Sequence, residues 1–396
     1  MSLIKKIKKE TKRIYPHMVS VRRYIHQNPE LSYEEANTSA YVCSHLEENG
    51  IPYKAGYCKH GIVAEIKTSR PGGITYLRGD MDALPIVEAN DVSYKSKVEG
   101  VMHACGHDVH TTCVLGASIV LNKLKEELAG TFRIIFQPGE EKLPGGASIM
   151  IKEGAIKNAS KANIFGQHVH PPLDAGKVGF YPGEYMASAD EIFIDIIGKG
   201  GHAALPSELV DTVVVTAHVL VALQTVVSRH SDPKVPAVLS FGKINSVGGA
   251  SNIIPDKVRI IGTLRTMDEA NRLKLHDTIR TIVRNTCKSY GAKARVNIKY
   301  GYPTLYNNPE LTKQSMDHAR DYMGSKNVVM LEKRMSAEDF SYFSQMMPAC
   351  FYRLGIRNEE KGITSGVHTP TFDIDEKALE VGVGLMAYLA AQNNMK

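Results

Sequence analysis

The chain has 396 residues, of which 43% are hydrophobic and 23% charged, a composition typical of a globular protein with more than one domain. Its formal charge of +6 comes from scattered basic residues. The one notable basic run, from Lys5 to Arg13, is predicted to lie on a solvated face of an N-terminal helix. Because no RNA- or DNA-binding signature accompanies this run, the sequence argues against a nucleic-acid partner.

The first residues, MSLIKKIKKETKRIY, hold no apolar core long enough for a signal peptide, and no later stretch is predicted to span a membrane. We therefore expect a cytoplasmic protein without a membrane partner. The six cysteines are spread thinly along the chain. In a reducing compartment we interpret them as free thiols or metal ligands, and not as a disulfide framework.

Apolar, β-rich runs alternate with helical patterns before about Tyr181. Strands are predicted at Gly73–Leu77, Phe132–Phe136 and Ala162–Gly166, and helices at Ser39–Glu48 and Val109–Leu128. Repeated strand, helix, strand order indicates an α/β domain with a mostly parallel sheet and helices on both faces.

A composition break at Tyr181–Tyr185 (YPGEY) precedes a segment with another order of elements. The expected strand, helix, strand, strand, helix and strand lie at Glu191–Gly198, Leu209–Arg229, Ala237–Ile244, Val258–Arg265, Glu269–Tyr290 and Ala294–Tyr300. This is the split-βαβ order of a ferredoxin-like domain. We therefore predict a catalytic domain at residues 1–185 and 303–396, interrupted by an inserted α+β lid or dimerisation domain at residues 186–302.

Ligand-type residues follow the apolar runs. Asp80 and Asp82 come after GITYLR, the pair Glu140–Glu141 after FRIIFQPG, and His168 after ANIFGQ. In an open α/β sheet these positions are the carboxyl ends of strands, where such folds place their sites. We therefore expect these side chains to meet in one crevice.

The densest cluster is VMHACGHDVH, with His103, Cys105, His107, Asp108 and His110. Thiolate, imidazole and carboxylate together form the donor set that Zn²⁺ prefers. The alternative is a polar loop before a helix with Cys105 simply packed, but so many imidazoles beside a thiol and a carboxylate would pack badly. The spacing therefore favours a metal site.

The adjacent glutamates Glu140 and Glu141 are a weaker signal, because paired glutamates are usually solvated surface. Here they follow a buried-looking strand and precede the flexible PGGA. One could bind metal while its neighbour acts as general base for a water molecule, a division of labour that suits hydrolysis.

The chain resembles the N-acyl-amino-acid amidohydrolases, the dinuclear-metal group of aminoacylases, hippurate hydrolases and auxin-conjugate hydrolases, which is related to zinc carboxypeptidases. The matching blocks extend over nearly the whole chain: HQNPELSYEE, RGDMDALP, GVMHACGHDVH, FQPGEE, GKGGHAALP, NIIPDKVRIIGTLRT, SAEDFSYF and VHTPTFDID. The resemblance implies metal-dependent hydrolysis of the amide bond of N-acyl-L-amino acids or short peptides. A dipeptidase or carboxypeptidase acting through the same site is the alternative.

The resemblance also implies two divalent ions per chain, zinc in the first place, with manganese or cobalt as alternatives. It implies metal ligands at Cys105, His107, Glu141, His168 and His368. Cys105 would bridge the two ions, and Asp80 stands where more distant zinc-peptidase relatives have a ligating histidine.

Further roles come from the same resemblance. Glu140 would be the general base and Asp82 a carboxylate that supports the ligands. In the inserted domain, His202 would help polarise the scissile carbonyl, often from a partner subunit, and Asn252 and Arg265 would hold the substrate carboxylate. Without the resemblance, we would interpret these three residues as turn or surface positions.

The chain departs from the family pattern beside the glutamate pair. Gly139 replaces the usual alanine, and Lys142–Pro144 replaces a stretch of glycines, so the wall beside the base could differ. Two other hypotheses stay open: Cys105 as a nucleophile paired with His107 or His103, and a metal- or ligand-binding protein without catalysis. We expect a homodimer or larger homo-oligomer that forms through the inserted domain.

Overall fold

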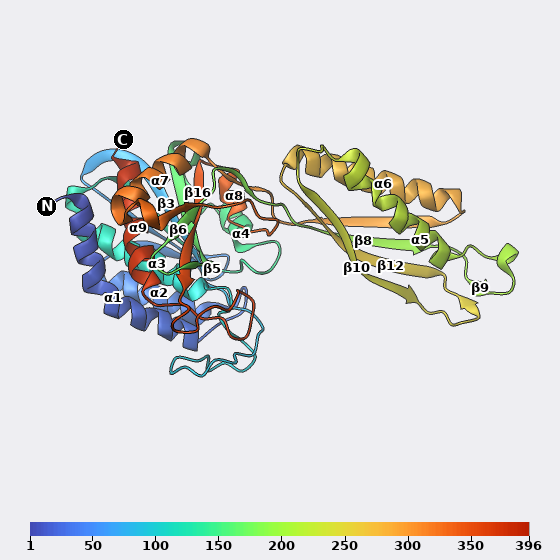
Figure 1. Ribbon diagram of the computed structural model, residues 1–396, viewed down its shortest axis with the longest axis horizontal. Helices are drawn as coiled ribbons and strands as arrows, with labels where there is room; N and C mark the ends of the chain where they lie inside the picture. The colour runs from blue at the N-terminus through green and yellow to red at the C-terminus, as the bar shows by residue number, and fades with distance from the viewer. Residues whose placement is uncertain (396) are drawn as a thin grey trace. The chain divides into compact units, whose positions relative to one another are not determined.

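A computed structural model of the chain describes residues 1–395 and contains two compact units (Figure 1). Unit 1 comprises Met1–Gly183, Tyr306–Glu332 and the residues from Asp339 onward. Unit 2 comprises Glu184–Leu305 and Lys333–Glu338. The short strands β7 (Gly183–Met186) and β14 (Leu305–Asn307) mark two of the places where the chain passes between the units.

Unit 1 is built on an eight-stranded sheet of order β1-β2-β4-β3-β5-β16-β6-β15. Its strands are β1 (Tyr53–Tyr57), β2 (Gly61–Lys67), β3 (Arg70–Asp80), β4 (Ala129–Gln137), β5 (Ala162–Asp174), β6 (Val178–Phe180), β15 (Val328–Met330) and β16 (Ala349–Arg357). The centre of the sheet, β4-β3-β5-β16, is parallel, which confirms the prediction of a mostly parallel sheet. The strands β1 and β2 add an antiparallel edge that the sequence pattern did not indicate.

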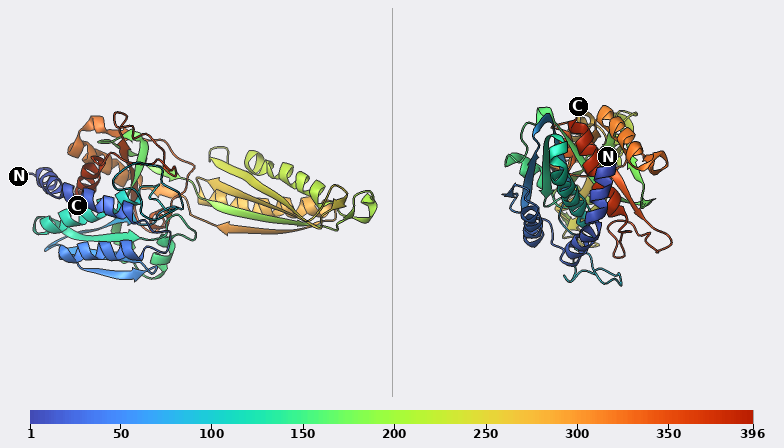
Figure 2. Two further views of the ribbon diagram at one scale, coloured as in Figure 1. Left: turned by 90° about the horizontal axis from the view of Figure 1, so that it is seen from below. Right: turned by 90° about the vertical axis from the view of Figure 1, so that its left-hand side faces the viewer.

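Helices cover this sheet. They are α1 (Leu3–Gln27), α2 (Ala36–Glu48), α3 (His107–Leu124), α4 (Gly146–Lys152), α7 (Pro309–Met323), α8 (Ser341–Ser344) and α9 (Ala378–Asn394). The central helices α3 and α9 pack on β3 and on each other, and α1 lies against both (Figure 2). In α1 the residues Ile7, Ile14, Met18 and Val21 are buried, at the spacing of a single apolar helix face. The opposite, lysine-rich face is solvated.

Unit 2 contains a four-stranded antiparallel sheet of order β10-β12-β8-β13 with two helices packed on it. In chain order its elements are β8 (Asp190–Ile197), α5 (Thr212–Leu223), β10 (Ala237–Val247), β12 (Lys257–Thr266), α6 (Glu269–Ser289) and β13 (Lys293–Tyr300). A two-stranded sheet joins β9 (Gly201–His202) to β11 (Ile253–Ile254). The helix expected at Leu209–Arg229 is shorter, because α5 ends at Leu223 and a π-helical turn, Val226–His230, follows.

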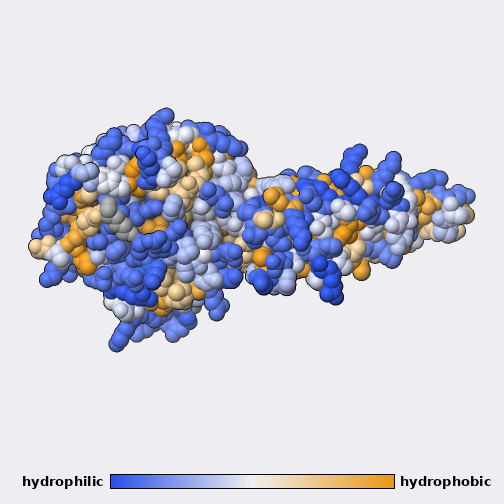
Figure 3. Space-filling model, turned by 90° about the horizontal axis from the view of Figure 1, so that it is seen from above, coloured by the Kyte–Doolittle hydropathy of each residue, from blue (hydrophilic) through white to orange (hydrophobic). Residues whose placement is uncertain are grey.

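One helical segment, Thr212–His230, is long and apolar enough to cross a membrane by length and composition alone. This corrects our expectation that no stretch qualifies. The buried side chains of this segment, including Val215, Val219, Leu223 and Val226, belong to the core of unit 2, and the core helix of a folded domain meets the same criterion. The surface drawn in Figure 3 shows hydrophobic residues in small areas between hydrophilic ones.

A buried carboxylate joins the elements of unit 2. Asp190 Oδ1 accepts hydrogen bonds from Arg272 Nη2 (2.5 Å) and from the Gly301 amide (3.0 Å), and its Oδ2 lies 2.6 Å from His276 Nε2. Burial alone would raise the pKa of Asp190, but the hydrogen bonds from Arg272 and His276 lower it to about 2. The ion pair therefore ties the start of β8 to α6 and to the end of β13.

We expect Asp190→Asn to lower the free energy of unfolding by about 3 kcal/mol at pH 7, because it removes the buried carboxylate that pairs with Arg272 and leaves the partly exposed Glu269 as the remaining ion-pair partner. In the wild type the folded-state pKa lies below the ordinary value of about 3.9. The contribution of this carboxylate is thus present above pH 4 and is lost as the pH falls towards 2, by about 2 kcal/mol. Thermal unfolding of both proteins at pH 7 and at pH 3 measures this, and an equal difference at both pH values would contradict it.

Candidate metal centre

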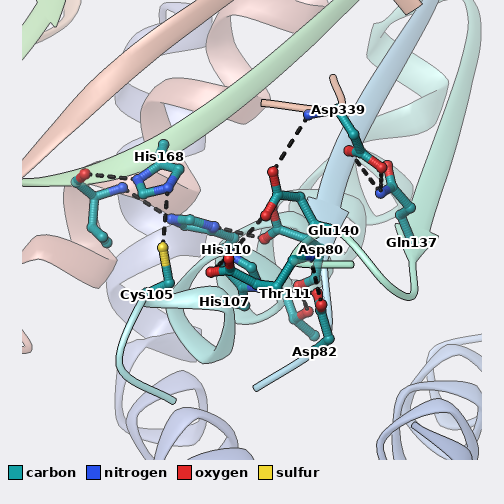
Figure 4. Close-up of polar contacts among 12 residues, drawn as sticks. Asp80, Asp82, Cys105, His107, His110, Thr111, Gln137, Glu140, His168 and Asp339 are labelled. Atoms are coloured by element: carbon teal, nitrogen blue, oxygen red, sulfur yellow. Dashed lines mark hydrogen bonds and ion pairs between the residues drawn. The ribbon is translucent and has the colours of Figure 1, made fainter. Parts of the chain in front are cut away.

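Four chain segments deliver donor atoms to one place in unit 1, and Figure 4 shows Cys105, His107 and His168 among them. Cys105 lies just before α3 and His107 is the first residue of this helix. Glu141 follows β4, His168 lies in β5, and His368 comes from a C-terminal loop. Between the first two residues, Gly106 has φ +81°, and a Cβ atom there would lie 2.6 Å from Val169 Cγ2. Only glycine allows the loop to turn and to approach β5 this closely.

The donor atoms form overlapping triads in which all atoms lie within 4.8 Å of one another: Cys105, His107 and His168; Cys105, Glu141 and His368; and His107, Glu140 and Glu141. The Cys105 Sγ lies 3.5 Å from His168 Nε2 and 3.3 Å from His368 Nε2. The thiol therefore belongs to two triads, and His107 and Glu141 are likewise shared between triads.

Atoms without partners show that this donor set fits divalent cations. His107 Nε2 is buried and has no hydrogen-bond partner, while its Nδ1 lies 3.1 Å from Asp82 Oδ1. The Nδ1 of His168 donates to the Val169 carbonyl (2.8 Å), which leaves its Nε2 directed at Cys105. An imidazole held through one nitrogen and open at the other is the usual arrangement of a metal-binding histidine.

The surroundings of Cys105 and His368 favour the protonated forms of both groups. Burial, and then the nearby Glu141 carboxylate, raises the pKa of the Cys105 thiol. Hydrogen bonds to Cys105 and Glu141 raise the pKa of His368 to about 10. A coordinated cation deprotonates thiols and displaces protons from imidazoles, so it would take the place of these protons.

Asp82 holds two of the candidate ligands, His107 and Glu141, in position. Its Oδ1 contacts the His107 ring, and its Oδ2 accepts hydrogen bonds from the Glu141 amide (2.9 Å) and from Ser32 Oγ (2.7 Å). The carboxylate is fully buried, and despite that burial the hydrogen bond from His107 lowers its pKa. Asp82 thus fixes the tautomer of His107 and the backbone of Glu141 together.

We expect Asp82→Asn to weaken divalent-cation affinity about 10- to 100-fold, because the amide cannot reproduce the charge behind His107. Competition with a chromophoric chelator measures this affinity. Asp91→Asn, at an exposed position, is the matched control. Equal affinities of the two variants would show that Asp82 does not act on the metal.

Asp80 is placed differently. Its Oδ1 lies 2.7 Å from His110 Nδ1, and its Oδ2 accepts from Arg78 Nη1 (2.5 Å). The Nε2 of His110 accepts the Val169 amide (2.9 Å). Asp80 and His110 are therefore occupied by internal hydrogen bonds, and they hold the end of β3 to α3 and β5.

Glu140 lies beside the triads. It is 6% exposed, and its Oε1 lies 3.4 Å from the Asp339 amide. Asp339 itself is anchored by Arg78 Nη2 (2.7 Å) and by Gln137 Nε2. A buried carboxylate next to candidate ligands, and held by a backbone donor, is positioned to exchange a proton with a water molecule at the centre.

The predicted residues of unit 2 fall into two places. The strand β9 pairs with β11 so that His202 lies opposite Ile253, and the Ala203 amide donates to the Asn252 carbonyl (3.0 Å). His202 and Asn252 are therefore neighbours. Arg265 lies near the C-terminal end of β12, whereas Asn252 precedes the N-terminal end of this strand, Lys257. At the ordinary rise of a strand, Arg265 is about 26 Å from Lys257. One copy of unit 2 does not bring Asn252 and Arg265 together.

The sequence analysis missed the buried charges beneath the centre. Arg22 Nε donates to Asp108 Oδ2 (2.8 Å), which also lies 2.8 Å from His26 Nδ1. The Nε2 of His26 lies 3.2 Å from Glu88 Oε1. These contacts anchor the first turn of α3, next to His107. The block HQNPELSYEE, which begins at His26, was the one signal that the N-terminal helix contributes to the site.

Comparison with known proteins gives consistent matches. The sequence model of peptidase family M20/M25/M40 matches residues 76–392 of the chain. The chain is 39% identical to thermostable carboxypeptidase 2 of Saccharolobus solfataricus over 100% of both chains. It is 39% identical to IAA-amino acid hydrolase ILR1-like 2 of Arabidopsis thaliana, over 96% of this chain and 85% of that one. It is also similar to the crystal structure of Bacillus subtilis YXEP protein, a dinuclear metal binding peptidase from the M20 family, with a TM-score of 0.84, 32% identity, and coverage of 96% and 98%.

Proposed function

The chain belongs to peptidase family M20/M25/M40 and is a metal-dependent hydrolase of amide or peptide bonds, and from this premise we propose that it cleaves N-acyl-L-amino acids or short peptides. The products are an amino acid and a carboxylate. One observation carries this proposal: donors of the type that zinc prefers surround a shared thiol, with a further buried carboxylate, Glu140, beside them.

Cys105, His107, Glu141, His168 and His368 would hold two divalent ions, zinc in our proposal. Bound there, the ions would polarise the scissile carbonyl and lower the pKa of a water molecule. Glu140 takes the proton of this water and later delivers it to the leaving amine. Asp82 keeps His107 and Glu141 in place during the cycle through the contacts described above.

The arrangement of unit 2 supports a site completed by a second copy of the chain. We assign the binding of the substrate carboxylate to Asn252 and Arg265 and the polarisation of the scissile carbonyl to His202, with His202 and Asn252 contributed by the other copy of the chain. The separation of Asn252 from Arg265 along β12 supports this assignment, because the two side chains cannot reach one small ligand within a single unit.

We infer that unit 2 is a ferredoxin-like lid and dimerisation domain inserted into the catalytic domain. The strand order of unit 2 supports the ferredoxin-like fold. The dimerisation role is supported by exposed apolar side chains on the edge strand β10 and on α5, namely Val238, Ile244 and Val247 of β10 and Val214 and Val221 of α5. An unpaired edge beside apolar side chains is suited to a two-fold contact. We place the enzyme in the cytoplasm.

Two alternatives differ in their chemistry. Similarity to a protein named a carboxypeptidase favours exopeptidase activity at the same site as the second candidate. A Cys105 nucleophile would instead work without an ion. The buried, proton-binding state of this thiol is unfavourable for it, since the thiolate is the reactive form.

The test is metal content by elemental analysis, combined with hydrolysis of a panel of N-acyl amino acids and dipeptides before and after chelation. About two ions per chain, with activity lost to chelator and restored by zinc, would support the proposal. Turnover of dipeptides alone would favour the exopeptidase. Unchanged activity in metal-free protein would overturn the metal-dependent mechanism.

A further inference from the structure

The loop that carries both glutamates has little structure of its own. We define the glutamate loop as Gly139–Gly145, which joins β4 to α4 without regular secondary structure. Two backbone hydrogen bonds close it, from Gly146 to the Gly139 carbonyl (2.9 Å) and from Gly145 to the Lys142 carbonyl (3.0 Å). Since a base must be held within a fraction of an ångström to act well, other residues must fix this loop.

A short N-terminal segment contacts the loop along its length. The Tyr33 hydroxyl donates to the Lys142 carbonyl (2.6 Å) and accepts from the Gly145 amide (3.2 Å). Glu35 Oε1 accepts the Gly139 amide (2.7 Å). The segment between α1 and α2 thus holds the loop at its first residue, in its middle and at its last residue.

The same segment also acts on the Glu141 amide through Asp82. Ser32 Oγ donates to Asp82 Oδ2, the oxygen that accepts the Glu141 amide. Three residues of this segment, Ser32, Tyr33 and Glu35, therefore act on the loop, either directly or through the Asp82 carboxylate. We call Ser32, Tyr33 and Glu35 the brace.

The fit between brace and loop is close. Gly139 has φ +64°, and a Cβ atom at this position would lie 2.4 Å from Tyr33 Cε1. Tyr33 itself has φ +71°, a conformation that is strained for a non-glycine residue and persists only where its surroundings enforce it. The absence of a side chain at Gly139 therefore makes room for this ring.

Glu35 adds a second unusual feature. Its carboxylate is fully buried, and its Oε2 has no hydrogen-bond partner, although Oε1 also accepts the Tyr33 amide (3.0 Å). Burial, and then the charge of Asp82, raises the pKa of Glu35 to about 7. A buried carboxylate with one unpaired oxygen lowers the stability of the fold. The hydrogen bonds that Glu35 accepts from the Tyr33 and Gly139 amides explain why a glutamate is present here.

We propose that the brace positions Glu140 for proton transfer, so that Ser32, Tyr33 and Glu35 are positioning residues of the hydrolytic site. The proposal rests on the function assigned to Glu140 above. The brace acts through the backbone of the glutamate loop and through Asp82.

Tyr33→Phe tests the proposal, because it removes one hydroxyl and keeps the ring on Gly139. We expect kcat to fall about 10- to 100-fold with KM and metal content close to wild type. Faster amide hydrogen exchange should be confined to residues 139–145. Tyr24→Phe is the matched control, because Tyr24 is 43% exposed on α1. Loss of its hydroxyl should change neither kcat nor the amide exchange of residues 139–145.

A double-mutant cycle separates positioning from general damage. If Tyr33 acts through Glu140, adding Tyr33→Phe to Glu140→Gln should not lower the residual activity further. Independent, multiplicative losses would overturn the proposal, as would wild-type kcat or wild-type exchange in Tyr33→Phe. Where the wild-type enzyme shows no chelator-sensitive hydrolysis, the proposed function fails, and the exchange of residues 139–145 still decides whether the brace holds the loop.

Discussion

Glu140→Gln is expected to lower kcat about 10²- to 10⁴-fold, the range that removal of a general base produces, with KM and metal content close to wild type. Glutamine keeps the shape of the side chain and its contact with the Asp339 amide. It cannot accept a proton from water. The change therefore removes one step of the reaction without disturbing the neighbouring donors, and steady-state kinetics together with elemental analysis measures both consequences.

The control for this variant is Glu34→Gln, at an exposed position near the brace, which should behave as wild type. A Glu140→Gln enzyme that loses its metal would mean that Glu140 is a ligand. The triad of His107, Glu140 and Glu141 makes this a real alternative. Full activity with bound metal would show that another group takes the proton.

The location of the centre could be predicted from the sequence because it follows from the sheet. Asp82 and Glu141 come just after β3 and β4, neighbouring parallel strands, and parallel strands bring their carboxyl ends to one edge. Period and composition were enough to place these strands. No knowledge of side-chain contacts was needed for that step.

The supporting contacts could not be predicted, because they depend on residues that meet only after folding. Nothing in the local pattern relates Tyr33 to Lys142, or Arg22 to Asp108, which are separated by 109 and 86 positions. From the sequence alone, an arginine on an amphipathic helix is interpreted as a surface charge, because its buried partner is not known. Tertiary contacts, and not propensity, decide such positions.

The length of α5 was mispredicted for a related reason. The apolar run from Leu209 to Arg229 continues the helical period, yet the regular helix ends at Leu223 and continues as a π-helical turn. Periodicity does not distinguish these two geometries. The sequence pattern likewise did not indicate that Asn252 and Arg265 lie apart within unit 2, because this separation follows from the length of β12.

Cys105→Ala is expected to reduce bound metal below two ions per chain and to lower kcat at least 10²-fold. The thiol belongs to two donor triads, so its loss affects both ions, and losing the electrostatic contribution of a catalytic metal costs several kcal/mol of transition-state stabilisation. Cys43→Ala, which changes a partly exposed free thiol, is the matched control. Elemental analysis and steady-state kinetics at a fixed zinc concentration measure the two effects.

Cys105→Asp distinguishes a ligand from a nucleophile, which Cys105→Ala alone cannot do. A carboxylate is also a zinc ligand, so the aspartate variant should bind more metal than the alanine variant and should recover part of the chelator-sensitive activity. A cysteine nucleophile has no such substitute, because hydrolysis through the thiol needs the sulfur itself. Aspartate and alanine variants that are equally inactive while the aspartate variant binds two ions would therefore favour the nucleophile. Recovery of activity together with metal would assign Cys105 to the metal centre.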